Sequence, residues 1–308
     1  EAIALGAIHA GISGVYAYPG TPSTEITEYI QDHAPEVRSR WCTNEKTAME
    51  AALGMSYAGK RALVCMKHVG MNVAADAFVN SAITGVNGGL VVLAADDPSM
   101  HSSQNEQDSR FYGKFAMIPI LEPSTQQEAY DMMKYAYALS EEKKLPVLLR
   151  VVTRLAHSRA GVVVNDLMPQ NALNPDKERT WVLLPAIARR QYASLVAKQP
   201  DLVESSEHSP YNGMNAFEGK AKLGVIACGI GYNYVMENDP QSLGIPVLKV
   251  SQYPLPEASI KALAAQCESL LVAEDGQPLV EEQVKAILGA DYALKGRLTG
   301  DLPRMGEL

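Results

Sequence analysis

The sequence predicts an α/β protein in which a doubly wound parallel sheet is followed by a second, smaller α/β domain. From residue 14 to about residue 155, short β-type runs alternate with helix-like segments, which is the pattern of strand–helix–strand units. The run at 90–95 is apolar throughout, as in strands buried on both faces of a parallel sheet. We therefore expect a first domain at 1–155, a connecting arm at 156–220 and a second domain at 221–308.

Composition excludes several classes of protein. The 308 residues suffice for about two domains, and a hydrophobic fraction of 47% allows each to bury a core. The net charge of −8 argues against nucleic-acid or anionic-membrane partners, and no apolar run approaches the ~20 residues of a membrane span. The four cysteines show no CxxC spacing, so no metal ligand set is expected, and reduced thiols fit a cytoplasmic protein.

Helix start signals place the first elements. Thr21 is expected to cap the helix that follows strand 14–18, with Pro22 at its first position, and Asn44 is expected to cap the next helix. The other expected elements of this domain are strands at 37–42, 61–66, 90–95 and 146–152 and helices at 45–59, 70–83 and 124–140.

The expected arm holds one helix-like run, 184–198, among scattered Pro and Asn residues. Regular alternation then predicts strands at 222–227, 246–250 and 269–273 and helices at 233–238, 257–265 and 278–288.

Polar residues follow four strands of the first domain, where ligands bind in open α/β sheets. The four loops are 19–22, 43–46, 67–72 and 96–108. Each has a purely structural alternative: Thr21 and Asn72 as helix caps, Glu45 as a carboxylate favoured by a helix dipole, and Lys67 with His68 as solvated loop residues.

Two further loop features are ambiguous. The stretch 97–108 is either an ordinary surface loop or a binding segment, and its length without apolar anchors favours binding. Gly229-Ile230-Gly231 hints at a nucleotide loop, but Tyr234 stands where the third glycine of that motif belongs.

Taken together, the loops resemble one family. Residues 17–25 (AYPGTPSTE) and 44–54 (NEKTAMEAALG) are similar to the YPGTPS segment and the glutamate helix of the thiamine-diphosphate-dependent 2-oxoacid:ferredoxin oxidoreductases. Residues 67–72 (KHVGMN) and 103–110 (SQNEQDSR) resemble the alpha subunit of its indolepyruvate branch rather than the pyruvate branch. Residues 223–235 resemble the start of that family's transketolase-C-terminal-like domain.

The resemblance implies a pyrimidine-binding first domain in an enzyme that oxidatively decarboxylates arylpyruvates to acyl-CoA, with ferredoxin as electron acceptor. It implies that the Glu45 carboxyl bonds the aminopyrimidine ring of thiamine diphosphate and is the catalytic group. The other residues that it places at the site are Gly20, Thr21, Gly70 and Asn72 near the cofactor and Lys67, His68, His101, Gln104 and Asn105 near the substrate.

The sequence departs from the family at one point and lacks several of its modules. The pyruvate branch has a substrate-carboxylate arginine after the strand at 90–95, where this chain has Asp96 and Asp97. Neither a GDG motif for Mg and diphosphate nor the CxxC runs of [4Fe-4S] clusters are present.

We therefore expect those groups elsewhere in a complete enzyme, of which this chain is a portion. Its expected partners are a diphosphate-binding domain, a smaller second subunit, ferredoxin, CoA and a second copy of the subunit. Two alternatives remain open: the same chemistry on 2-oxoglutarate or branched-chain 2-oxoacids, and a non-catalytic scaffold of the same fold.

Overall fold

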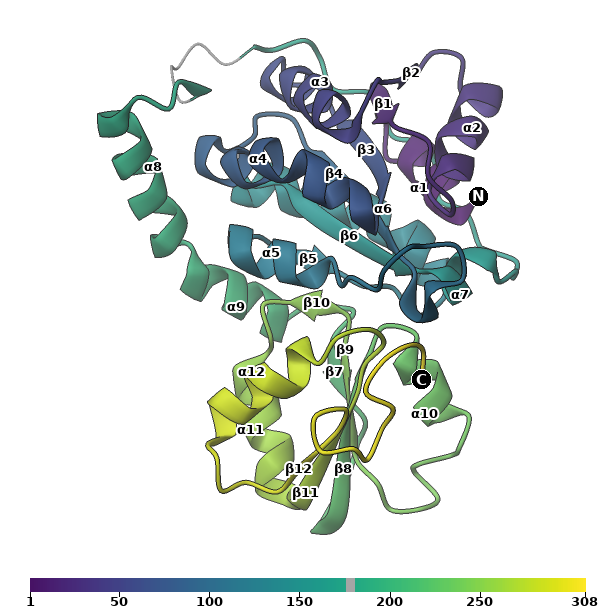
Figure 1. Ribbon diagram of the computed structural model, residues 1–308, viewed down its shortest axis with the longest axis vertical. Helices are drawn as coiled ribbons and strands as arrows, with labels where there is room; N and C mark the ends of the chain where they lie inside the picture. The colour runs from purple at the N-terminus through teal and green to yellow at the C-terminus, as the bar shows by residue number, and fades with distance from the viewer. Residues whose placement is uncertain (176–180) are drawn as a thin grey trace. The chain divides into compact units, whose positions relative to one another are not determined.

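The computed structural model describes residues 1–175 and 181–308 (Figure 1). Contacts divide the chain into two compact units. The first contains residues 1–96, 109–121 and 125–199; the second contains 97–108, 122–124 and 200–308. Residues 156–175 and 181–199 of the expected arm thus pack with the first unit, while the loop 97–108 packs with the second.

The first unit is built on a parallel sheet whose strands lie in the order β5-β6-β4-β3-β1-β2. The central strands β4 and β6 are buried along their whole length, as the apolar run at 90–95 predicts, and β3 is buried up to Lys67. The strands are β1 (Gly14–Ala17), β2 (Arg38–Trp41), β3 (Ala62–Lys67), β4 (Leu90–Asp96), β5 (Ile120–Leu121) and β6 (Val147–Val152).

Helices cover both faces of this sheet, so the prediction of a doubly wound fold is confirmed (Figure 1). On one face α1 packs against α2 and α6, and on the other α4 packs against α3, α5 and α8. The helices are α1 (Ala2–His9), α2 (Thr24–His33), α3 (Glu45–Tyr57), α4 (His68–Thr84), α5 (Arg110–Ala116), α6 (Gln126–Lys143), α7 (Thr153–His157) and α8 (Pro185–Ala197).

Two helix starts differ from the prediction. Thr21 does not cap α2, because residues 20–23 form a turn in which the Gly20 carbonyl accepts bonds from the backbone N–H and hydroxyl of Ser23, at 2.8 and 2.7 Å. The helix then begins at Thr24, whose hydroxyl accepts the Gly20 N–H at 2.8 Å. The expected loop 67–72 is absent, since α4 begins at His68 directly after β3. His68 and Met71 are buried, which draws this segment into the core as a helix rather than leaving it in solvent.

The extended stretch 158–175 is tied to the first unit by hydrogen bonds. The Met168 N–H donates to the His9 carbonyl at 2.8 Å, and the Asn174 N–H donates to the Ala58 carbonyl at 2.9 Å. Asn171 donates to Glu141, 2.7 Å away. The stretch is therefore part of the packed unit, although it forms no helix or strand.

The second unit has its own sheet, in the order β12-β11-β8-β9-β7, with β7 antiparallel to β9 and the other pairs parallel. Val225, Ala227, Val247 and Ala273 form one buried hydrophobic cluster on this sheet. Its elements are α9 (Gln199–Glu207), β7 (Gly213–Met214), β8 (Ala221–Cys228), α10 (Gly231–Met236), β9 (Val247–Val250), β10 (Gln252–Tyr253), α11 (Glu257–Gln266), β11 (Cys267–Ala273), α12 (Leu279–Leu288) and β12 (Leu294–Lys295).

Candidate active site

Three of the four predicted loops follow neighbouring strands at one edge of the first sheet. In register, Ala17 at the end of β1 pairs with Trp41 of β2 and Cys65 of β3. Because parallel strands end at the same edge, the segments that begin at Tyr18, Cys42 and His68 emerge together.

Glu45 is the first residue of α3 and is 9% exposed. Asn44 caps the helix as predicted, since its side chain accepts the Thr47 N–H at 2.9 Å. The Glu45 carboxyl rests on the backbone of Gly70, where an added Cβ would lie 2.6 Å from Oε1 and 2.9 Å from the carboxyl carbon. Any side chain at residue 70 would therefore displace the carboxyl.

Gly20 and Lys67 make a second close approach. A Cβ at Gly20 would lie 3.2 Å from the Lys67 Cβ, so the 20–23 turn lies against the end of β3. Thr21 is exposed in this turn. Gly20 and Thr21 are thus brought beside the segment that also carries His68 and Gly70.

The neighbouring candidates differ in accessibility. Lys67 is half-buried, whereas the His68 side chain is completely buried, so the alternative of a solvated loop is wrong for His68. Asn72 is exposed on α4 and accepts a hydrogen bond from the Tyr112 hydroxyl of α5. Burial raises the pKa of the Tyr112 phenol further above neutral pH, so the hydroxyl donates to Asn72 in its protonated form. No local sequence pattern points to Tyr112, because its contact with Asn72 joins residues 40 positions apart.

Asp96 stands where the pyruvate branch has its arginine, and its carboxylate is bonded to other residues of the first unit. Its carboxylate accepts from Arg150 Nε at 2.6 Å, with both side chains completely buried. It also accepts the Ser109 N–H at 2.9 Å. Arg110, at the start of α5, is a second fully buried guanidinium that the sequence analysis did not single out.

The fourth predicted loop belongs to the second unit and is described with it. Buried Asp97 organises its first half, accepting from the N–H groups of His101 and Ser102 at 3.1 and 2.9 Å. The side chains of His101, Gln104 and Asn105 are exposed. His101 Nε2 lies 3.2 Å from Glu307 Oε1.

The geometry argues against a nucleotide loop at Gly229. A Cβ at Gly229 would lie 2.7 Å from the carboxyl of Glu122, in the same unit. A carboxylate at that position would repel a phosphate group.

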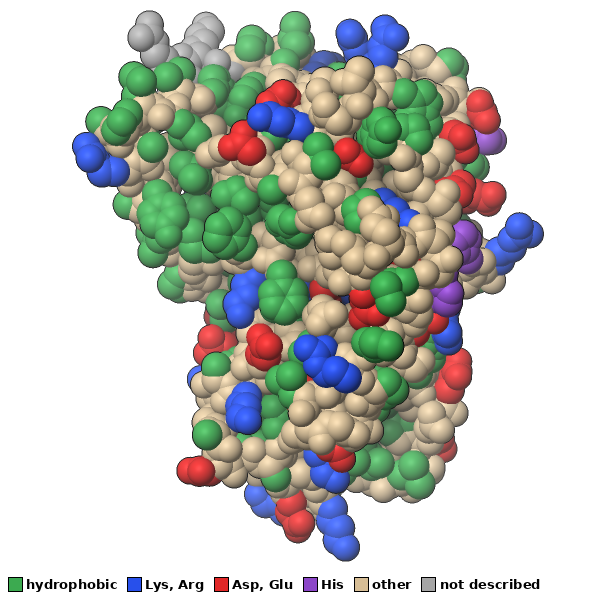
Figure 2. Space-filling model, viewed as in Figure 1, with side chains coloured by type: hydrophobic (Ala, Val, Ile, Leu, Met, Phe, Trp, Pro, Cys, Tyr) green, Lys and Arg blue, Asp and Glu red, His purple; other side chains and the backbone are tan. Residues whose placement is uncertain are grey.

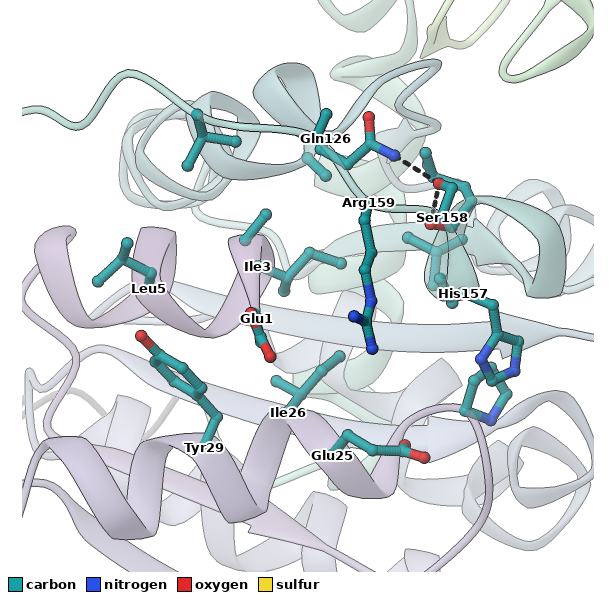
Figure 3. Close-up of a pocket in the computed structure, with 18 residues that line it drawn as sticks. Glu1, Ile3, Leu5, Glu25, Ile26, Tyr29, Gln126, His157, Ser158 and Arg159 are labelled. Carbon is teal, nitrogen blue, oxygen red and sulfur yellow. Dashed lines mark hydrogen bonds between the residues drawn. The ribbon is translucent and has the colours of Figure 1, made fainter.

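A cavity of about 730 Å³ lies elsewhere in the first unit, between α1, α2 and α6 (Figure 3). Arg159 extends into it, and Glu25, Tyr29 and His157 line it. Of the predicted site residues, none lines this cavity.

Doubly wound α/β proteins are a class that binds ligands beyond the C-terminal ends of the parallel strands. In the first unit, the buried Glu45 side chain lies at this edge of the sheet. Residues 5–201 match the family described as pyruvate flavodoxin/ferredoxin oxidoreductase, thiamine diphosphate-binding, and the chain belongs to this family.

Curated relatives show which members of this family the chain resembles in sequence. The chain is 43% identical to indolepyruvate oxidoreductase subunit IorA of Archaeoglobus fulgidus over 98% of its length and 50% of that protein. It is 40% identical to subunit IorA of Methanothermobacter thermautotrophicus over 100% of its length and 51% of that protein. Identity to the 2-oxoglutarate synthase subunit KorA of Methanocaldococcus jannaschii is 27%, over 54% of this chain and 48% of that protein. The chain thus spans about half the length of the indolepyruvate relatives that it matches.

A solved structure shares the fold. The 2-oxoglutarate:ferredoxin oxidoreductase from Magnetococcus marinus, with 2-oxoglutarate, coenzyme A and succinyl-CoA bound, matches 96% of this chain and 60% of its own, with a TM-score of 0.75 and 17% identity.

The residues at the edge suit the aminopyrimidine end of thiamine diphosphate. A nearly buried carboxyl is held in place by the close approach of Gly70, and an exposed hydroxyl and amide lie on neighbouring segments. In residues 1–175 and 181–308, His, Cys, Asp and Glu side chains form no group of three that could hold a metal ion. Within the same residues, no helix combines the length and apolarity needed to span a bilayer.

Proposed function

We propose that the chain supplies the pyrimidine-binding part of an enzyme that oxidatively decarboxylates arylpyruvates, indolepyruvate among them, to acyl-CoA with ferredoxin as electron acceptor. The observation that carries the proposal is the Glu45 carboxyl, which is nearly buried at the start of α3 and seated on Gly70. A structural carboxylate at a helix start needs neither burial nor a glycine opposite it.

Thiamine diphosphate, when bound, would supply the nucleophile and the electron sink for decarboxylation of a 2-oxoacid. The role of Glu45 is to hold a proton at its carboxyl against a ring nitrogen of the aminopyrimidine. Gly70 fixes the position of that carboxyl, and Glu45 lies on the buried face of α3 together with Ala48 and Met49. These contacts act before any substrate is bound.

The other edge residues would complete the site. Gly20 and Thr21 present a backbone and a hydroxyl beside Lys67, and Asn72 presents an amide oriented by Tyr112. We assign Gly20, Thr21, Gly70 and Asn72 to the cofactor. We assign Lys67, His68, His101, Gln104 and Asn105 to the substrate. Because the His68 side chain is completely buried, it would influence the substrate from below the molecular surface.

We propose indolepyruvate rather than 2-oxoglutarate as the substrate, because the relatives with near-complete coverage of this chain are indolepyruvate oxidoreductase subunits. The 2-oxoglutarate synthase subunit matches only about half of the chain, at lower identity. Asp96 stands where the pyruvate branch has its arginine and is paired with the buried Arg150, which argues against the pyruvate branch.

The complete enzyme requires further parts: a diphosphate-binding domain with Mg, iron–sulfur clusters, a smaller second subunit and a second copy of this subunit. We place it in the cytoplasm.

Exposed apolar side chains on three adjoining helices support the proposal that this chain binds protein partners, and apolar surface gathers over α5 and α8 (Figure 2). These side chains are Val73, Phe111, Phe115, Tyr192 and Val196. A native polypeptide of about 65 kDa would place the diphosphate and cluster domains on the same chain.

The decisive experiment compares Glu45→Gln with Glu50→Gln in the complete enzyme, using a dye-linked assay on arylpyruvates, 2-oxoglutarate and branched-chain 2-oxoacids. Glu45→Gln is expected to lower turnover by about 10²–10⁴-fold, the usual contribution of a positioned acid–base group. Glu50, which is exposed on the same helix, is the matched control and should leave turnover unchanged. Undiminished turnover by Glu45→Gln would refute the catalytic assignment, and absence of turnover in the wild type would favour the scaffold alternative.

A further inference from the structure

Within the second unit, the loop 97–108 is bound by the C-terminal stretch 303–308. The Glu106 carboxylate accepts the Gly306 N–H at 3.0 and 2.9 Å, and the Ser99 hydroxyl accepts the Glu307 N–H at 2.9 Å. The Glu307 carboxylate in turn lies 3.2 Å from His101. Three residues of the loop thus contact two consecutive residues of the stretch.

Arg297 anchors the stretch to the body of the unit. Its guanidinium is completely buried and donates to the carbonyls of Pro303 and Gly306, at 2.7 and 2.8 Å. Its Nε donates to the Glu274 carbonyl, at the end of β11, at 2.8 Å. A buried guanidinium is stable only with such partners, so the stretch is held firmly.

The loop is held in a costly backbone conformation. Ser99 and Met100 have φ values of 69° and 54°, in the left-handed region that non-glycine residues rarely adopt. The Ser99 N–H is secured by Glu106 at 3.2 Å. Gly306, with φ 84°, faces Ser99 so closely that a Cβ there would lie 2.6 Å from the Ser99 hydroxyl. Conformations of this kind persist where surrounding contacts enforce them.

We propose that residues 303–308, which we call the clamp, hold loop 97–108 in the conformation that presents His101, Gln104 and Asn105 to the substrate. Ser99, Glu106 and Gly306 are then positioning residues. Gln104 and Asn105 are exposed on this loop, and His101 is exposed beside Glu307 of the clamp. The Ser99 hydroxyl and the Glu106 carboxylate bind the clamp backbone. The substrate part of this inference rests on the proposed function; the clamp itself does not.

Hydrogen–deuterium exchange on the complete protein that contains this chain tests the clamp without an activity measurement. Glu106→Ala and Gly306→Ala are expected to speed exchange of the amides at 99–107 by about tenfold, the factor for losing one charge-assisted hydrogen bond. Met305→Ser is the matched control, because Met305 lies in the clamp with its side chain 69% exposed. Unchanged exchange in both variants would overturn the clamp.

Kinetics of the complete enzyme test the positioning role. Glu106→Ala is expected to raise KM for an arylpyruvate by about tenfold while kcat changes far less, and Glu106→Gln, which keeps one acceptor oxygen, should restore part of the effect. Faster exchange with unchanged KM would overturn the positioning role and leave the proposed function intact. If the wild type turned over no 2-oxoacid, the proposed function would fail, and the exchange result alone would decide the clamp.

Discussion

At the scale of single residues, Gly70 determines where the Glu45 carboxyl can lie. An alanine at residue 70 would place its Cβ 2.6 Å from Oε1 and 2.7 Å from the Glu45 Cγ, so the carboxyl must move. We expect Gly70→Ala to lower turnover of the complete enzyme by about 10²-fold, as misplacement of a catalytic group by about an ångström does. The fold, followed by circular dichroism, should persist.

Gly54 offers the matched control for this substitution. It lies in α3, nine residues after Glu45, and a Cβ there meets nothing within 4 Å. Gly54→Ala should leave turnover unchanged and stabilise the helix by about 1 kcal/mol, measured by urea unfolding. Equal losses of turnover in the two variants would show that the contact with Glu45 is not what Gly70 provides.

Sequence reasoning was most successful for residues whose role depends on near neighbours in the chain. Asn44 was predicted as a helix cap from its position before a helical pattern, and this is confirmed. Thr21 was predicted as a cap by the same logic and is not one, because residues 20–23 form a turn and α2 begins only at Thr24. The burial of His68 and the pairing of Asn72 with Tyr112 depend on tertiary packing, which local patterns do not report.

At the scale of elements, the Glu141 carboxylate of α6 links the extended stretch 158–175 to Arg61, the residue before β3. Glu141 receives Arg61 Nε and a second guanidinium nitrogen at 2.8 Å each, and Asn171 at 2.7 Å. Burial by itself would raise the pKa of Glu141, but these hydrogen bonds and the nearby charge of Arg61 outweigh it and lower the pKa below its ordinary value.

A pH dependence of stability follows from this shift. Because the folded-state pKa lies below the unfolded value of about 4.3, the carboxylate stabilises the fold above that pH, and the contribution is lost as pH falls through the folded pKa. Glu141→Gln should therefore cost about 2 kcal/mol of unfolding free energy at pH 7, and the gap to wild type should close below pH ~4.

Urea unfolding of both proteins across that range measures the gap. Glu142→Gln, at a position whose side chain is 68% exposed, is the control and should stay within about 0.5 kcal/mol of wild type throughout. A gap that is independent of pH would contradict the assignment of the lowered pKa to Glu141.

At the scale of the whole molecule, the two units are interlaced along the chain. The segments 97–108 and 122–124 lie between elements of the first unit in sequence but join the second. The contacts that draw them there are single polar bonds, such as Tyr253 to Glu122 at 2.7 Å and the Gln277 N–H to Asp108 at 3.1 Å. The alternation of strands and helices predicted both α/β sheets, but a local pattern cannot predict hydrogen bonds between residues more than 100 positions apart.

Fragments of the chain can test whether the residues beyond 155 stabilise the first unit. A fragment 1–155 would lose the bonds of Met168 to His9 and of Asn174 to Ala58, together with the stacking of Trp181 on Tyr57, whose ring centroids are 3.9 Å apart. A fragment 1–199 keeps all of them. We expect 1–199 to melt about 5–10 °C above 1–155, since each lost hydrogen bond costs about 1 kcal/mol.

Thermal unfolding of the two purified fragments, followed by circular dichroism at equal concentration, measures the difference. A third fragment that ends at residue 175 serves as the control: it keeps the bonds of Met168, Asn171 and Asn174 but lacks Trp181 and α8, so its melting temperature should fall between the other two. Equal melting temperatures for 1–155 and 1–199 would mean that residues 156–199 only cover the first unit. In that case the boundary expected at residue 155 would mark the end of the independently stable domain.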